Sequence, residues 1–173
     1  MFKFEKCSKY MQTFTYPLFF RILYRYGNIP VTIIFLIYLV PAVLFLDKNL
    51  LYMIPIVALL LLIYYTNKRY LYLYKIIPYK ITADDEKMYC TDFIFSKREF
   101  TIYYSDIALL KGGIFEGKLN GLMIINDGRN KTTIGFYPRL KNIKELQKIL
   151  LNRVNKPVYD AVVEKINKRN KKD

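Results

Sequence analysis

The stretch IPVTIIFLIYLVPAVLFL, residues Ile29 to Leu46, contains no formally charged residue over eighteen positions. At about 1.5 Å of rise per residue, a helix of this length covers most of a hydrocarbon core that is ~30 Å thick. A globular protein needs a large shell to hide a helix that is apolar on every side, and this chain is too short to supply one. The stretch therefore predicts a membrane-spanning helix, with Asn28 as its N-cap and a kink at Pro41.

A second apolar run, LLYMIPIVALLLLIYY from Leu50 to Tyr65, begins after only three intervening residues, Asp47 to Asn49. Thr66 and Asn67 extend this run at the interface, so that it can span a bilayer. So short a turn favours an antiparallel pair, and Pro55 predicts a second kink. We therefore expect a transmembrane helical hairpin over residues 29–67, made of helices 29–46 and 50–67.

The chain is apolar and basic at once: 53% of its 173 residues are hydrophobic and its net charge is +14. This combination is typical of a protein that is anchored in a membrane and faces an anionic leaflet. Nucleic acid is the other usual partner of such charge, but the hairpin makes it less favoured, and we expect none. Cys7 and Cys90 lie far apart without metal-binding or redox spacing, which indicates a reduced compartment.

The sequence offers little for catalysis. It contains no histidine, which excludes imidazole acid–base chemistry, histidine-activated nucleophiles and imidazole ligands to metal or haem. It also lacks nucleotide-binding and hydrolase motifs. Asp92, Asp106 and Cys90 remain, and we interpret them as strand-end hydrogen-bonding groups and a buried thiol. We therefore expect no enzyme activity, no catalytic residue, no metal and no cofactor.

Residues 1–28 form an N-terminal segment that includes YPLFFRILYRY, Tyr16 to Tyr26. Pro17 suits the first turn of a helix, on which Arg21 and Arg25 share a face. The segment is expected to be cytoplasmic or interfacial, with this helix lying on the lipid headgroups. The alternative, a helix that packs on the hairpin or on the soluble domain, stays open.

Basic residues flank the hairpin on both sides. At its turn the charges cancel, because Asp47 offsets Lys48. The flanking residues include Arg21, Arg25, Lys68, Arg69 and Lys75. By the positive-inside rule both termini are cytoplasmic, and we expect the inner membrane of a bacterium. Residues 68–78 are expected to be a juxtamembrane stalk, because tyrosines of the kind that settle at the water–lipid interface are dense there.

From Tyr79 apolar and polar residues alternate, which predicts short β-strands. We expect strands at Lys80–Ala83, Met88–Ser96 and Phe100–Tyr104, and then a hairpin of Leu119–Asn126 with Lys131–Tyr137. Asp127-Gly128 is expected to join the hairpin, because this pair readily takes the positive φ angles of a tight turn. From Leu140 to Val154 the apolar spacing becomes three and four, which predicts an amphipathic helix.

The tract of residues 79–155 resembles the bacterial pleckstrin-homology-like (PH-like) domains. The resemblance is carried by YKIT at Tyr79–Thr82, YSDI at Tyr104–Ile107, a glycine-containing hairpin and the helix LQKILL at Leu146–Leu151. It implies a strongly bent antiparallel sheet or barrel capped by a C-terminal helix, in a binding or assembly module without catalysis. Phosphoinositide-binding members carry basic residues after the first strand. Here Asp84-Asp85-Glu86 stands there, and its carboxylates argue against capture of that headgroup.

Residues 156–173 are expected to be a basic C-terminal helix and tail. Near an anionic leaflet each basic side chain there gains about 1 kcal/mol. A solvated tail that only confers solubility is an equally good interpretation. An RNA contact would lack an aromatic RNA-reading motif.

Together these features predict an α+β membrane protein, with a two-helix transmembrane hairpin followed by a PH-like domain. We expect a membrane-anchored, non-catalytic binding or scaffold protein whose partners are anionic lipids and another membrane protein or a second copy. The alternative is an accessory subunit of a larger integral membrane complex. The candidate lipid or partner contacts are Arg21, Arg25, Lys68, Arg69, Lys75, Lys165, Lys168, Arg169, Lys171 and Lys172.

Overall fold

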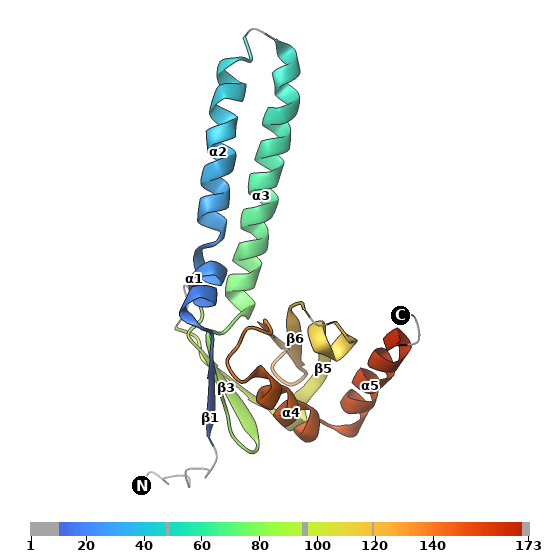
Figure 1. The fold of residues 1–173 in the computed structure, drawn as a ribbon. Coiled ribbons are helices and arrows are strands. Elements are labelled where there is room, and N and C mark those ends of the chain that lie inside the picture. The colour runs from blue at the N-terminus through green and yellow to red at the C-terminus, as the bar shows by residue number, and fades with distance from the viewer. Residues whose placement is uncertain (1–10, 48, 95–96, 119, 171–173) are drawn as a thin grey trace. The chain divides into compact units, whose positions relative to one another are not determined.

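The computed structural model of the chain describes residues 11–47, 49–94, 97–118 and 120–170. Over these residues the fold is mixed α+β, with two antiparallel sheets and five α-helices (Figure 1). The chain divides into two compact units. Residues Leu18–Lys75 form the helical unit, and the residues before and after them form the sheet unit.

The sheet unit contains one sheet of four strands and one of three. The order is β1-β2-β3-β4 in the first sheet and β5-β6-β7 in the second. The strands are β1 (Gln12–Thr15), β2 (Lys80–Ala83), β3 (Lys87–Thr91), β4 (Phe100–Tyr103), β5 (Ile107–Lys111), β6 (Met123–Asp127) and β7 (Thr132–Phe136). Short 3-10 helices η2 (Tyr104–Asp106) and η3 (Gly113–Glu116) flank β5, and the helices α4 (Ile143–Arg153) and α5 (Lys156–Asn170) complete the unit.

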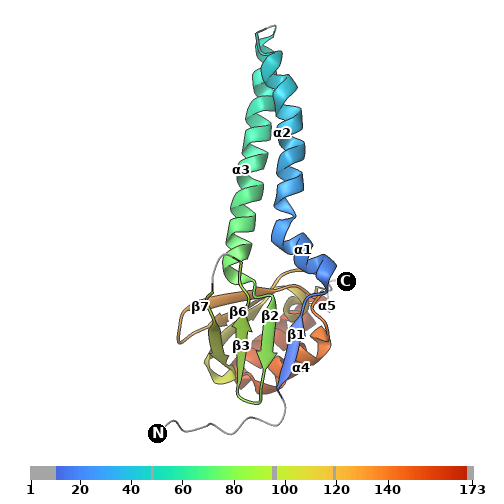
Figure 2. The same cartoon turned by 90° about the vertical axis from the view of Figure 1, so that its left-hand side faces the viewer.

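Strand β1 belongs to the sheet, although the sequence analysis assigned residues 1–28 to a separate segment. It pairs with β2 in antiparallel register, Phe14 opposite Ile81 and Thr15 opposite Lys80 (Figure 2). Phe14 and Tyr16 are buried, and the Tyr16 hydroxyl accepts a hydrogen bond from the Tyr137 backbone N–H at 2.8 Å. The N-terminal segment therefore supplies core side chains as well as a strand.

The core of the four-stranded sheet can be followed along one row of paired residues. Phe14 lies opposite Ile81, which lies opposite Cys90, and each of the three is at most 1% exposed. In the other sheet Ile125 lies opposite Ile134, and both are buried. Buried residues alternate with less buried ones along β2, β3 and β6, as the two-residue periodicity predicted, but they do not alternate along β7.

One predicted strand ends early in the structure, and one strand was not predicted. The strand expected at Met88–Ser96 stops at Thr91, because Asp92 takes a positive φ of 61° that breaks the extended backbone. Ser96 lies outside the described residues. Strand β5 was not expected at all. Only two of its five residues, Ile107 and Leu110, are buried, so it lacks the two-residue alternation on which the expectation depended.

The β6–β7 hairpin is where the sequence predicts it, but its turn is different. The last pair is Asp127 with Thr132, so four residues form the loop, and the positive φ of 51° falls on Lys131. The tight Asp127-Gly128 turn was therefore a wrong prediction. The physical reason is that the buried Asp127 carboxylate accepts the backbone N–H groups of Arg129 and Asn130, at 2.8 and 3.2 Å, and folds the loop around itself.

The helical unit consists of α1 (Leu18–Tyr26), α2 (Asn28–Leu44), the 3-10 helix η1 (Leu50–Tyr52) and α3 (Met53–Ile76). Helix α3 continues through the predicted stalk as far as Ile76. The expected kink at Pro55 does not apply, because Pro55 lies in the first turn of α3, where a proline removes no helical hydrogen bond. Pro41 lies inside α2.

The helical unit bends at Gly27, where α1 and α2 meet at 46°. A Cβ atom on Gly27 would lie 2.5 Å from the Leu23 carbonyl oxygen and 2.6 Å from the Tyr70 hydroxyl. Glycine therefore allows the close approach here, since a larger residue has to shift the Leu23 carbonyl group and the Tyr70 ring.

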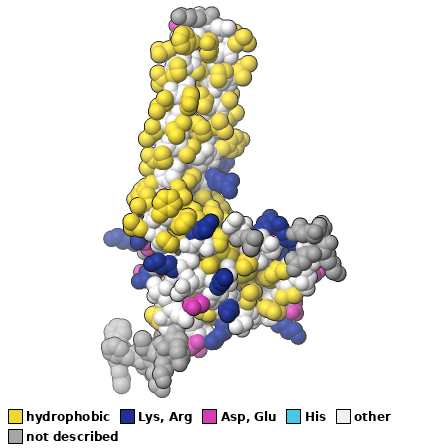
Figure 3. Space-filling model, in the orientation of Figure 1, with side chains coloured by type: hydrophobic (Ala, Val, Ile, Leu, Met, Phe, Trp, Pro, Cys, Tyr) yellow, Lys and Arg dark blue, Asp and Glu magenta, His cyan; other side chains and the backbone are white. Residues whose placement is uncertain are grey.

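Length and composition make one helical stretch, Leu50–Ile76, a candidate to cross a membrane. Its most apolar part has a mean hydropathy of 1.9 and no buried residue. Helices α1 and α2 meet the same criterion only together, as a bent pair, so the described residues hold one candidate span or two. Figure 3 shows apolar side chains over the visible face of this unit.

Candidate functional site

Five of the predicted contact residues lie at one end of the helical unit. Arg21 and Arg25 are on α1, and Lys68, Arg69 and Lys75 are on the last two and a half turns of α3. Contacts along the hairpin show that α2 and α3 are antiparallel: Asn28 contacts Asn67, whereas Phe45 contacts Tyr52 near the turn. The structure therefore brings these five cations to the same end, which we call the open end (residues 18–28 and 67–76).

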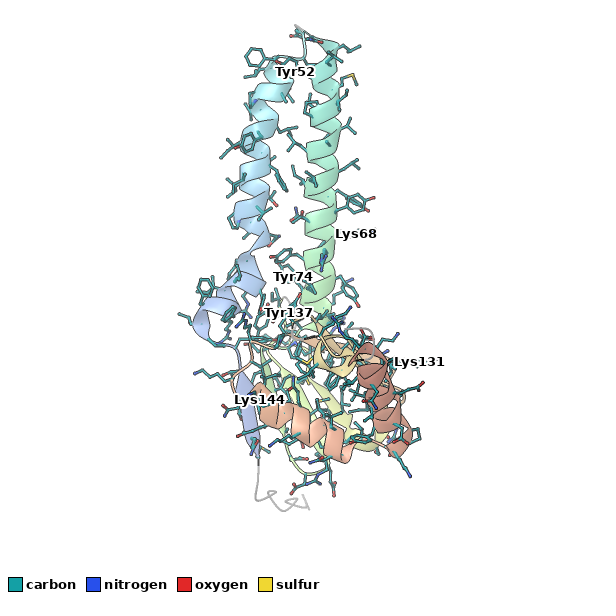
Figure 4. The ribbon with its side chains drawn as sticks, turned by 45° about the vertical axis from the view of Figure 1, so that its right-hand side comes forward. Tyr52, Lys68, Tyr74, Lys131, Tyr137 and Lys144 are labelled. Atoms are coloured by element: carbon teal, nitrogen blue, oxygen red, sulfur yellow. The ribbon has the colours of Figure 1, made fainter. Side chains whose placement is uncertain are left out.

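A group of polar side chains joins the helices at the open end. Asn28 Nδ2 donates to Asn67 Oδ1 at 2.9 Å, and Asn67 Nδ2 donates to Thr32 Oγ1 at 3.0 Å and to the Ile63 carbonyl at 2.9 Å. The hydroxyl of Tyr74, a residue that Figure 4 labels, lies 2.7 Å from Asn28 Oδ1. We call Asn28, Thr32, Asn67 and Tyr74 the asparagine cluster. Its amide groups satisfy one another, as groups in an apolar environment must.

The role of Asn28 differs from the one expected. Gly27 is the residue that precedes α2, and no side chain caps this helix. Asn28 instead lies within the first turn, and its side-chain amide bonds to α3 at both atoms. Its Nδ2 donates to Asn67 and its Oδ1 accepts from Tyr74. The Gly27 N–H bonds to the Leu23 carbonyl oxygen at 2.9 Å, so a turn of helix precedes α2 in place of a side-chain cap.

Helix α1 exposes one apolar side. Leu18, Phe19, Ile22 and Tyr26 are between 49% and 75% exposed, and their spacing of one, three and four places them on one face. Arg21 and Arg25 are less exposed and have interactions of their own. An exposed apolar stripe flanked by cations has the composition of a helix that lies in a membrane interface.

A groove of about 670 Å³ runs along one side of α3. It is lined by apolar, aromatic and cationic side chains in turn: Ile63, Tyr64, Asn67, Lys68, Leu71, Tyr72 and Lys75. Lys68 is exposed and donates from Nζ to the Tyr64 hydroxyl at 3.4 Å, with Nζ 5.4 Å from the Tyr64 ring centroid. Arg69 does not line the groove. Two of the predicted cations are thus in the groove and one is beside it.

The C-terminal cations belong to the sheet unit and are arranged differently. Lys168 pairs with Glu164 at 2.6 Å, one turn earlier on α5, and the hydrogen bond from Lys168 lowers the pKa of that carboxyl. The Arg169 stem packs over Gly117, and Lys165 is half-buried. Lys171 and Lys172 lie outside the described residues. Helix α5 packs on η3 and β5. Lys168 and Arg169 therefore already have contacts within the sheet unit.

The acidic turn Asp84-Asp85-Glu86 is tied into the sheet unit. Asp84 Oδ1 accepts the backbone N–H groups of Glu86 and Lys87, each at 2.8 Å, and Asp85 pairs with Arg153 of α4 at 3.0 Å. A hollow of about 340 Å³ beside this turn is lined by Asp85, Glu86 and Arg153, among others. Two of the three carboxylates thus hold the turn and α4 together.

The side chains weighed for catalysis are spread over separate places. Cys90 is fully buried, and burial raises the pKa of its thiol to about 12. Asp92 accepts the Tyr79 N–H through its backbone carbonyl, while the Asp106 carboxylate lies 3.7 Å from Arg129. Within the described ranges, no three carboxylate or thiol groups are placed to hold a metal ion.

The sequence analysis missed the asparagine cluster. Its signal was present in the sequence as isolated amide and hydroxyl residues at the borders of two apolar runs, Asn28 and Thr32 in one and Asn67 in the other. Their partnership depends on the register between the two helices, which the sequence pattern does not give.

Comparison of the chain with family models, curated proteins and solved structures found no match.

Proposed function

We propose that this chain is a membrane-anchored, non-catalytic scaffold or binding protein. In this proposal α2 and α3 cross the inner membrane of a bacterium as a hairpin, α1 lies in the interface, and the sheet unit is a PH-like module in the cytoplasm. The paragraphs below give the support for each part.

The observation that carries the proposal is the uncovered apolar surface of α2 and α3. Ile37, Leu44 and Ile54 are 63%, 70% and 69% exposed, and the most apolar part of Leu50–Ile76 has no buried residue. A soluble protein rarely exposes so large a continuous apolar surface. Lipid tails would cover it without any further protein, because the backbone N–H and C=O groups of a helix are bonded internally everywhere except at its ends.

The strand pairing supports two crossings instead of one. β1 ends at Thr15 and β2 begins at Lys80, and these two residues are paired in the sheet. The helical unit is the whole connection between them. A single crossing would separate them by a hydrocarbon core ~30 Å thick, whereas neighbouring strands lie about 5 Å apart. The pairing therefore favours α2 as the second crossing beside α3.

The charge distribution supports the orientation. The open end carries Arg21, Arg25, Lys68, Arg69 and Lys75, whereas the turn at the other end has Asp47 against Lys48. By the positive-inside rule the open end faces the cytoplasm. Because β1 and β2 continue directly from that end, the sheet unit would be cytoplasmic too.

The sheet unit supports the PH-like assignment through its architecture. Four antiparallel strands followed by three, and then a helix that buries Leu146 and Leu150, agree with what the resemblance implies. In this arrangement β1 is an edge strand of the first sheet. An edge strand offers unpaired backbone groups to a peptide, which is a common mode of binding without chemistry.

Single-cysteine labelling tests the proposal. In a Cys7→Ser background, Asp47→Cys places a thiol at the hairpin turn and Lys144→Cys places one on the exposed surface of α4. Cys90 stays in both variants as an internal control, because its buried thiol is unreactive in the folded protein. With a membrane-impermeant maleimide on intact spheroplasts, we expect labelling of Asp47→Cys alone, and of Lys144→Cys only after permeabilisation.

Three results would overturn parts of the proposal. Release of the protein from membranes by an alkaline wash would refute the crossings. Labelling of both variants in intact spheroplasts would refute the topology. Purification in mild detergent as a fixed-stoichiometry complex would instead favour an accessory subunit of that complex over a separate scaffold.

A further inference from the structure

The groove on α3 combines an apolar wall with two ammonium groups. Ile63 and Leu71 provide the apolar wall, and Lys68 and Lys75 lie on the same side of the helix. The two lysines are seven residues apart, which is two helical turns and about 10 Å along the axis. Tyr64 and Tyr72 place aromatic rings with hydroxyl groups between and beside them.

No carboxylate of the helical unit neutralises these lysines. The only acidic residue between Leu18 and Lys75 in the sequence is Asp47, at the hairpin turn. The helix rises roughly 27 Å between Leu50, which follows the turn, and Lys68. The Asp47 carboxylate is therefore separated from Lys68 by well over a Debye length at physiological salt. The groove therefore carries a local positive charge that an anion would complement.

The hydrogen-bonding capacity of the groove suits a phosphate. Lys68 Nζ uses one of its three donors on the Tyr64 hydroxyl at 3.4 Å, which leaves donors for a ligand. Lys75 is exposed at the end of α3. Lysine stems lie along apolar surface while their ammonium groups extend to the polar layer, so both can reach a headgroup that is centred between them.

We propose that this groove binds an anionic phospholipid. The phosphate would lie between Lys68 and Lys75, and an acyl chain would run along Leu71 and Ile63 toward the middle of α3. This inference depends on the proposed function, because it needs α3 in a bilayer. A free phosphate ion would use the two ammonium groups but leave the apolar wall uncovered, and the apolar wall is what favours a lipid.

The natural chain contains no tryptophan, so a single Tyr72→Trp substitution places one indole in the groove. The full-length protein is reconstituted into neutral phosphatidylcholine bilayers that contain a small, equal fraction of a brominated lipid. The brominated lipid is phosphatidylglycerol in one sample and phosphatidylcholine in the other. We expect the anionic lipid to quench the indole more strongly, because it is enriched at the groove.

Charge substitutions locate the effect. Lys68→Gln and Lys75→Gln are each expected to lower the preference for the anionic lipid about fivefold, the effect of one surface cation. Arg69→Gln is the matched control, since it removes the same charge from the same helix outside the groove and should leave the preference unchanged. An equal loss in all three variants would mean diffuse surface attraction and would overturn the site.

Two further outcomes separate this inference from the proposed function. Equal quenching by the two brominated lipids would overturn the lipid site while leaving the membrane hairpin intact, whereas no quenching by either lipid would overturn both. Relief of the anionic preference by soluble glycerol phosphate would show that the groove takes a free phosphate and not a lipid.

Discussion

Replacing Phe14 with alanine tests whether the N-terminal strand is part of the folded sheet unit. Phe14 is 1% exposed and lies opposite Ile81, which lies opposite Cys90. Truncation of a buried phenylalanine costs about 3–5 kcal/mol, as lost transfer energy and a residual cavity. A domain is stable by only about 5–15 kcal/mol, so Phe14→Ala should lower the thermal midpoint of the sheet unit by roughly 10–20 °C.

The position of Cys90 supplies the assay. In a Cys7→Ser background Cys90 is the single thiol of the chain. It is 0% exposed and its pKa is raised to about 12 by burial, so it reacts with a maleimide only when the sheet opens. Because labelling follows the open population, a loss of 3–5 kcal/mol should speed it by roughly 100-fold to a few thousandfold in detergent-solubilised full-length protein.

The adjacent residue gives the control. Thr13 lies on the same strand, paired with Thr82, but its side chain is exposed, so Thr13→Ala should change the labelling rate of Cys90 little. If Phe14→Ala labels at the rate of Thr13→Ala, then β1 does not unfold together with the sheet. The assignment of the N-terminal strand to the core would then be wrong.

Gly27→Ala should destabilise the helical unit by about 1–3 kcal/mol, because its Cβ would lie 2.6 Å from the Tyr70 hydroxyl. Denaturation in detergent measures this loss, and an unchanged midpoint would contradict the close packing. Asn67→Leu should lower the free energy of unfolding by about 1–2 kcal/mol in the same assay, since two interhelical hydrogen bonds are lost. A more stable variant would refute the stabilising role of the asparagine cluster. The raised pKa of Cys90 means that the folded state keeps its proton after the unfolded thiol, of ordinary pKa 9.0, has lost it. Stability should therefore fall from about pH 9 upward, more steeply than in Cys90→Ala, and parallel curves for the two proteins would contradict the burial.

The sequence alone predicted the elements whose pattern is local. The two apolar runs, the strand at Lys80–Ala83 and the amphipathic helix that contains Leu146 and Leu150 are helices and strand in the structure. Each is specified within a window of a few residues, because a side chain's position on a helix or strand follows from its spacing in the chain. The sequence also predicts that the cations of the open end lie at the same end of the hairpin, since a short turn brings the flanks of two antiparallel helices together.

Contacts between distant residues were decided only by the tertiary structure. Strand β1 is four residues long and has no periodicity of its own, and it becomes a strand because β2, beyond the whole helical unit, offers its backbone hydrogen bonds. The asparagine cluster joins residues 35 and 39 positions apart. Such features depend on register between elements, and register is set by the packing of the whole fold, which no local spacing of residues encodes.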